Sequence, residues 1–106
     1  LLAKGHTMVT YDRRGRGDVV AVYDLHHDVL MKRIVGLPGE SIAIKAGRIY
    51  IDKKALDEPY ALARLSLRID RSDHLKPAEY FVVGDNRAVT VFGIIPATNI
   101  IGKVVF

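Results

Sequence analysis

The sequence predicts an all-β, mainly antiparallel domain, and three observations lead to this prediction. Short apolar runs rich in valine and isoleucine recur along the chain, and glycine, proline and aspartate separate them. Several runs alternate apolar with polar residues, as strands with one buried face do. The length of 106 residues and the hydrophobic fraction of 49% suit a single domain with its own core.

Each apolar run between turn residues is expected to form one strand. In chain order these runs are Thr7–Tyr11, Asp18–Tyr23, Val29–Val35, Ser41–Lys45, Arg48–Asp52, Tyr80–Val83 and Ile100–Phe106. The second run is dense in apolar residues, so it is expected to be buried on both faces. Ala46 and Gly47 separate the fourth and fifth runs, as in a two-residue hairpin.

The segment from about 53 to 76 differs from the rest because it is charged and has no steady period. We therefore expect a small inserted flap there, with the core strands within 7–52 and 77–106. No repeat or low-complexity segment divides the chain, so residues 1–106 are predicted to form one domain.

Composition excludes several kinds of site. The chain has no cysteine, which rules out a disulfide framework, a thiolate zinc site and a cysteine nucleophile. His26 and His27 are neighbours in a polar connection without a matching carboxylate spacing, so no metal is expected. The net charge of +4 comes without an aromatic platform, so no nucleic-acid partner is expected. The longest uncharged stretch, Ala88–Gly102, is too short and interrupted to span a bilayer.

One lysine stands on an apolar strand face. A period of two along Val29–Val35 places Leu30, Lys32 and Ile34 on the same face. If that face is in the core, burial lowers the pKa of Lys32 and turns its amine into a general base. In the alternative, the strand lies at a sheet edge and the lysine reaches water.

Four segments in order resemble the motifs of type I signal peptidases and cover nearly the whole chain. Arg16–Val20 is similar to the family's RGD(I/V)V segment, and Met31–Glu40 resembles its KRxxGxPGD box, with glutamate in place of the usual aspartate. Gly47–Tyr60 resembles its hairpin and EPY segment, and Tyr80–Arg87 its GDNR box. The resemblance implies the signal-peptidase or LexA-like β-ribbon and barrel fold.

The resemblance further implies a membrane-anchored serine endopeptidase that uses a Ser/Lys dyad without metal or cofactor. The lysine of the family's KR pair is the general base, and that position is Lys32 here. Thr90 takes the place of a serine whose hydroxyl helps to orient that lysine, and it can make the same hydrogen bond. Arg33, Gly84, Asp85, Asn86 and Arg87 match motif residues near the family's site. The family's DSR segment, whose Asp–Arg pair braces the site, is absent.

The nucleophile is expected outside this sequence. Leu1–His6 resembles the end of the family's serine box, which places the serine just upstream of Leu1 and the membrane anchor further upstream. The 106 residues alone are therefore expected to be inactive. Thr7 and Ser41 are poor substitutes, because Thr7 lacks the following proline and Ser41 lies beyond the Pro-Gly turn.

The expected substrates are signal peptides of preproteins with small residues, as in Ala-X-Ala, before the cut. Wall positions of the family's substrate pockets align with Leu2, Ala21, Leu30 and Met31, which could equally be ordinary core residues. The expected place is the extracytoplasmic side of the cell membrane, beside the membrane surface and the translocation machinery. Two alternatives remain: an inactive homologue acting as an assembly or chaperone module, and a LexA-like or UmuD-like self-cleaving Ser/Lys peptidase.

Overall fold

The structure is a computed structural model that describes residues 7–9, 15–57, 70–85 and 92–105. All described elements are strands apart from one short 3-10 helix, η1 (Ala97–Asn99), which confirms the all-β prediction. The strands are β1 (Thr7–Val9), β2 (Val19–Tyr23), β3 (Val29–Gly36), β4 (Ser41–Lys45), β5 (Arg48–Ile51), β6 (Lys54–Ala55), β7 (Arg71–His74), β8 (Glu79–Val83), β9 (Phe92–Pro96) and β10 (Ile100–Val105). No helix among the described residues is long and apolar enough to cross a membrane.

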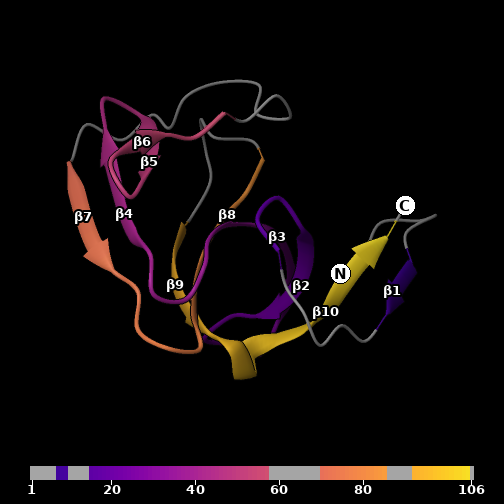
Figure 1. Ribbon diagram of the computed structural model, residues 1–106. Coiled ribbons are helices and arrows are strands. Elements are labelled where there is room, and N and C mark those ends of the chain that lie inside the picture. Colours follow the sequence, from indigo (N-terminus) through magenta and orange to yellow (C-terminus); the bar gives the residue numbers. More distant parts are fainter. Residues whose placement is uncertain (1–6, 10–14, 58–69, 86–91, 106) are drawn as a thin grey trace.

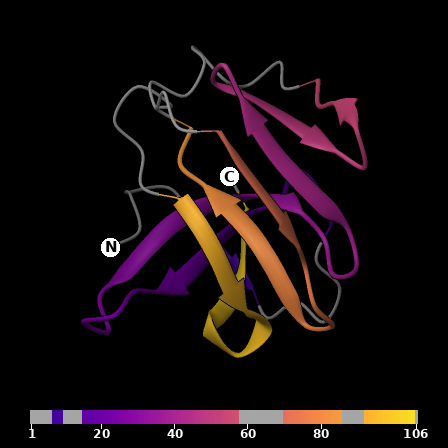
Figure 2. The same cartoon turned by 90° about the vertical axis from the view of Figure 1, so that its left-hand side faces the viewer.

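The strands form two antiparallel sheets (Figures 1 and 2). The large sheet has the order β1-β10-β2-β3-β8-β9, and the small sheet has the order β6-β5-β4-β7. The segment expected as a flap contributes β6 and β7 to the small sheet, while its residues 58–69 lie outside the described part. Strand β9 was not anticipated from the sequence, because its run Phe92–Pro96 contains a glycine and a proline.

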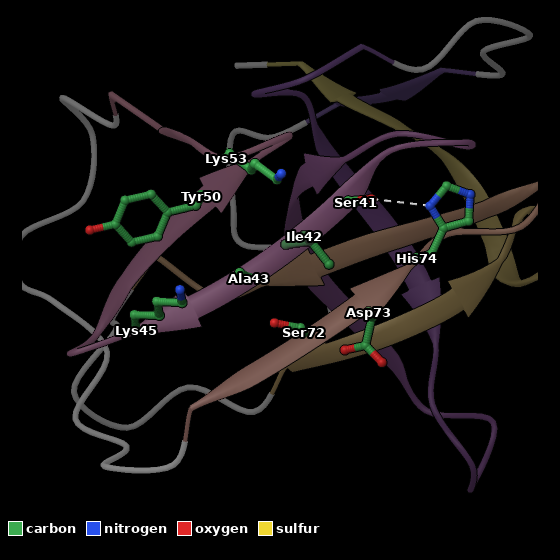
Figure 3. Close-up of a pocket in the computed structure, with 9 residues that line it drawn as sticks. All are labelled: Ser41, Ile42, Ala43, Lys45, Tyr50, Lys53, Ser72, Asp73 and His74. Atoms are coloured by element: carbon green, nitrogen blue, oxygen red, sulfur yellow. Dashed lines mark hydrogen bonds between the residues drawn. The ribbon is translucent and has the colours of Figure 1, made fainter.

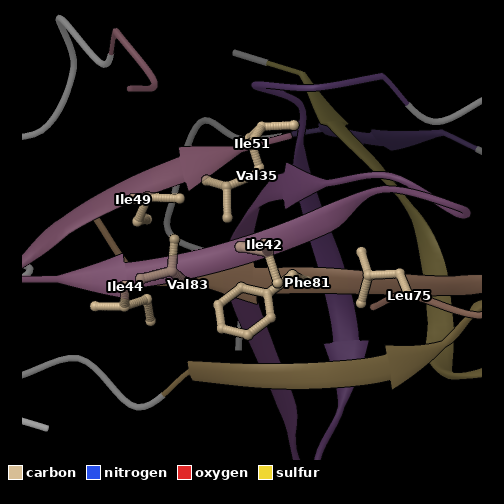
Figure 4. Close-up of a cluster of buried hydrophobic side chains, with 8 residues drawn as sticks. All are labelled: Val35, Ile42, Ile44, Ile49, Ile51, Leu75, Phe81 and Val83. Atoms are coloured by element: carbon tan, nitrogen blue, oxygen red, sulfur yellow. The ribbon is translucent and has the colours of Figure 1, made fainter. Parts of the chain in front are cut away.

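The largest hydrophobic cluster lies between the two sheets (Figure 4). It combines side chains of β3 and β8 from the large sheet with side chains of β4 and β5 from the small one. Its buried members are Val35, Ile42, Ile44, Ile49, Ile51, Leu75, Phe81 and Val83. In β4 and β5 every second residue is an isoleucine of this cluster, so the alternation read from the sequence selects the face that packs.

A second cluster lies on the opposite face of the large sheet, which we call the inner face. Its buried residues come from β2, β3, β8 and β10, and partly buried Ile95 adds β9. Side chains from five strands of one sheet can meet on one face only if that sheet curls around them. Val19–Val22 are all buried, as predicted, because each face of β2 packs against one cluster. Tyr23, at the end of the run predicted to be buried, is 41% exposed.

Two turns have backbone conformations that match the turn residues in the sequence. The hairpin between β4 and β5 pairs Lys45 with Arg48 across Ala46 (φ 50°) and Gly47 (φ 77°). Two consecutive positive φ angles are typical of the type I′ turn that suits a hairpin's twist. Between the sheets, Gly39 follows Pro38 and has a φ of 83°. A type II turn requires such a positive φ at its third residue, and proline is common at its second.

Gly36 allows the chain to leave the large sheet at a crowded place. A Cβ atom at this position would lie 2.9 Å from both Leu75 Cδ1 and Phe81 Cβ. The register between β3 and β8 shifts between Ile34 and Gly36, so the strand bends there.

Gly36→Ala is therefore expected to destabilise the fold by about 1–3 kcal/mol, because the new methyl group overpacks two buried side chains. Gly93→Ala is the matched control, since Gly93 also lies in a strand of the large sheet and a Cβ there would meet nothing within 4 Å. Urea unfolding of both variants measures the difference. Equal stability of the two variants would contradict this account of Gly36.

Candidate active site

Lys32 lies on the inner face of a central strand. β3 pairs with β2 on one side and β8 on the other, so the edge-strand alternative is wrong. Lys32 stands directly opposite Val20 and two residues before Ile34, and both of these side chains are fully buried. Burial lowers the pKa of Lys32 below its ordinary value, because the charged form loses part of its hydration. A lysine in this setting gives up its proton more readily than one in water.

The neighbouring Arg33 faces the other way and fixes the strand. Its Nε and Nη2 donate to the two carboxylate oxygens of Asp85 at 2.7 and 2.6 Å, and its Nη1 donates to the carbonyl oxygen of Gly17 at 2.7 Å. The planar guanidinium thus makes a bidentate ion pair, which sets orientation as well as distance. Three motif segments far apart in sequence meet at this one side chain.

A second bidentate pair closes the turn after β3. Arg16 donates to Glu40 Oε1 and Oε2 at 2.7 and 2.6 Å, and also to the carbonyl oxygen of Val35 at 3.0 Å. The same carboxylate accepts the backbone N–H of Leu37 at 2.7 Å. Glu40 therefore binds the arginine of the RGD-like segment, an interaction that was not predicted from the sequence.

The residues predicted to line substrate pockets divide between the two faces. Ala21 and Met31 stand opposite one another on the face that bears Arg33, where they pack with Val19 and Val104. Leu30, which is 38% exposed, is on the inner face beside Lys32. The fourth predicted pocket residue, Leu2, lies outside the described residues.

Part of the predicted site lies beyond what the structure describes. Asp85 and Gly84 of the GDNR-like box are described, and they follow β8 directly. Asn86, Arg87 and Thr90 are outside the described residues, so the orienting role of Thr90 stays a prediction. Within the described ranges, no group of three or more His, Cys, Asp or Glu side chains could hold a metal ion.

A cavity of about 770 Å³ lies over the small sheet (Figure 3), and Lys32 is not among the residues that line it. It is lined by Ser41, Ile42, Ala43, Lys45, Tyr50, Lys53, Ser72, Asp73 and His74. Ser41 Oγ and His74 Nδ1 form a hydrogen bond of 3.1 Å across the β4–β7 pair. No sequence signal could have joined these two residues, because only strand pairing brings positions 33 apart together.

Comparison with known proteins decides the family. The sequence model described as signal peptidase, peptidase S26, matches residues 3–106. The chain belongs to this family. The four ordered motifs read from the sequence are thereby explained as signal peptidase motifs.

Curated relatives carry the name signal peptidase I. Signal peptidase I S of Bacillus subtilis (strain 168) is 39% identical over 84 aligned positions, and the match covers 68% of this chain and 44% of the relative. Signal peptidase I V of the same strain is 33% identical over 106 aligned positions, and the match covers 84% of this chain and 63% of the relative. Signal peptidase IB of Staphylococcus aureus is 30% identical over 112 aligned positions, and the match covers 86% of this chain and 59% of the relative. The chain spans about half the length of these relatives.

A solved structure shows the same fold. The crystal structure of a signal peptidase I from Enterococcus faecalis V583 matches with a TM-score of 0.74 and 22% sequence identity. The match covers 89% of this chain and 98% of that chain. The signal-peptidase fold expected from the motifs is therefore confirmed.

The Arg33–Asp85 pair is expected to contribute measurably to stability. Because the Arg33 side chain is only 16% exposed and the pair is bidentate, a double-mutant cycle with Arg33→Met and Asp85→Asn should give a coupling energy of about 1 kcal/mol. The Arg71–Asp73 pair, whose arginine side chain is 38% exposed, is the control and should give less than about 0.5 kcal/mol. Coupling energies of equal size, measured by urea unfolding, would count against this bracing role.

Proposed function

We propose that this chain supplies the general base of a signal peptidase, and that the base is Lys32. The observation that carries the proposal is the half-buried position of Lys32 on a central strand of a signal peptidase fold, where burial lowers its pKa. The neutral amine accepts the proton of a serine hydroxyl, and the resulting alkoxide attacks the scissile carbonyl carbon. The ammonium then protonates the leaving amine, and water hydrolyses the acyl-enzyme. No cofactor takes part.

We infer that the nucleophile is a serine upstream of Leu1. Two of the three serines, Ser41 and Ser72, line the cavity over the small sheet, and Ser66 is outside the described residues. Ser41 is hydrogen-bonded to His74 there, in a different sheet from Lys32. In this proposal the 106 residues hold one half of the dyad and do not cleave peptides alone.

The proposed substrates are signal peptides of exported preproteins with small residues before the cut. The substrate would lie extended beside the strand that carries Lys32, with main-chain hydrogen bonds supplying affinity. The proposed setting is the extracytoplasmic surface of the membrane, near the translocation machinery. The relatives' name, signal peptidase I, supports this assignment. Arg33 and Asp85 act as positioning residues by fixing the strand, and Thr90 would orient the lysine.

The first test restores the native residues upstream of Leu1, including the serine, and measures cleavage of a signal peptide substrate in lipid vesicles. Lys32→Met should reduce the turnover by about 10²–10⁴-fold, because proton transfer by a positioned base contributes that much. Lys54→Met, at an exposed lysine of β6, is the control and should retain activity. Residues 1–106 alone should give no turnover. Equal activity of the two variants, or turnover by residues 1–106, would refute the proposal.

The second test is the pH dependence of cleavage in the same extended protein. The base acts only when the amine is neutral, so activity should rise with pH through the pKa of Lys32. Because burial lowers this pKa, the midpoint of the rise should lie below 10.5, the ordinary lysine value. A rate that falls with pH over this range, or a midpoint at or above 10.5, would contradict the role of Lys32.

A further inference from the structure

The cavity over the small sheet lies on the face of that sheet that is turned away from the hydrophobic core. On β4, Ser41, Ala43 and Lys45 line the cavity, while the isoleucines between them pack in the core. Ala43 is the middle residue of the three, and it stands opposite Tyr50 on one side and Ser72 on the other. Because the alanine side chain is short, the centre of this face is hollow between the longer side chains at its two ends.

Three polar side chains from three segments gather at one end of the cavity. Ser41 of β4 stands opposite His74 of β7, and the hydrogen bond of 3.1 Å between Ser41 Oγ and His74 Nδ1 joins them. On the other side of Ser41, Asp52 accepts the Ser41 backbone N–H at 2.9 Å and donates its own backbone N–H to the Ser41 carbonyl oxygen at 2.8 Å. Lys53 follows Asp52, and its side chain extends toward Ser41 (Figure 3).

The Ser41–His74 pair can donate a hydrogen bond to a ligand in each protonation state of the imidazole. When Nδ1 carries a proton, it donates to Ser41 Oγ, and the hydroxyl can donate in another direction. When Nδ1 has no proton, the hydroxyl donates to it, and the N–H at Nε2 can point to a ligand. The ammonium of Lys53 brings three more N–H groups. This end of the cavity is therefore rich in donors.

The charges around the cavity favour an anion. Lys53 lies at one end and Lys45 at the other, and both side chains are exposed. Asp73 is the acidic residue among the described residues that line the cavity, and it forms an ion pair with Arg71. The lining therefore holds two lysines and one carboxylate whose charge is balanced by an arginine.

The backbone at Lys53 adopts a conformation that a side chain makes costly. Asp52 (φ 48°) and Lys53 (φ 72°) form the two-residue loop of a hairpin in which Ile51 pairs with Lys54. Two consecutive positive φ angles are typical of a type I′ turn, where glycine is strongly preferred. Strained positions of this kind cluster at ligand sites. The side chain of Lys53, which lines the cavity, gives the strain a functional reason.

We propose that this end of the cavity binds the phosphate group of an organic phosphate ester. A phosphate group has negative charge and three strong acceptor oxygens, which suit donors that come from three segments. The donors are Lys53 and the Ser41–His74 pair. The organic part of the ester lies over Ala43, in the hollow centre of the face. This site is separate from Lys32, so the proposal goes beyond the proposed peptidase function and does not depend on it.

The test titrates the 106-residue chain with glycerol phosphate and follows the backbone amide signals of β4 and β7 by NMR. Lys53→Met should weaken binding by about tenfold or more, because a charge-assisted hydrogen bond is lost. Lys54→Met is the matched control, since it removes the same charge from the next residue, which is not among those that line the cavity. It should bind like the parent chain. Equal affinities of the two variants would overturn the proposal.

Two further variants separate binding from folding. Lys53→Gly should raise the melting temperature, because glycine tolerates the positive φ, and should nevertheless weaken binding as Lys53→Met does. Ala43→Leu should weaken binding without a change of charge, because the larger side chain fills the hollow centre. An affinity equal to that of the parent chain in either variant would count against an organic phosphate at this site.

Vesicles distinguish a soluble ester from a lipid headgroup, which share this chemistry. Binding to phosphatidylglycerol vesicles that exceeds binding to phosphatidylcholine vesicles, and that Lys53→Met lowers but Lys54→Met does not, would assign a lipid headgroup. Binding of glycerol phosphate without this effect on vesicles would assign a soluble ester, and either pattern supports the proposal. Acetate that binds as tightly as glycerol phosphate would refute it, as would the absence of binding to both phosphate probes.

Discussion

The pairing of β3 with a strand on each side is the constraint on which the candidate site depends. Hydrogen bonds to β2 and β8 fix the register, so Lys32 must stand opposite Val20 and Arg33 opposite both Val19 and Val83. A slip of one residue would exchange the two side chains between faces. The lysine would then sit where the guanidinium now binds Asp85, and the amine would lose its apolar surroundings.

Charged pairs lock this register by joining segments that are distant in the chain. Arg33 connects β3 to Asp85 and to Gly17, while Arg16 connects the start of β2 to Glu40 beyond β3. Each guanidinium donates to both oxygens of its carboxylate, and such geometry resists rotation better than a single contact does. The motifs therefore work as one scaffold around Lys32, even though each was read separately.

Much of the fold could be predicted from the sequence, because alternation of apolar residues and turn residues depends only on neighbours along the chain. Ile42 and Ile44 alternate with polar or small residues, and Ala46-Gly47 marks the hairpin, so β4 and β5 were predicted almost to the residue. β9 was not predicted because Gly93 and Pro96 interrupt its apolar run. β7 was not predicted because its sequence, RSDH, is polar. This segment forms a strand through its pairing with β4.

The sequence by itself determined the strand that carries Lys32, the alternation that sets Lys32 apart from Arg33, and the family motifs, because these depend on neighbours along the chain. The tertiary structure decided that β3 is central, which cations meet which carboxylates, and that Lys103 reaches Asp18. The physical reason is that strand order and long-range ion pairs arise from packing between segments that are far apart in the chain. Asp18 and Lys103 are 85 residues apart, and the paired residues Thr7 and Val105 are 98 residues apart. Burial of an amine is a property of that assembly, and no single strand can supply it.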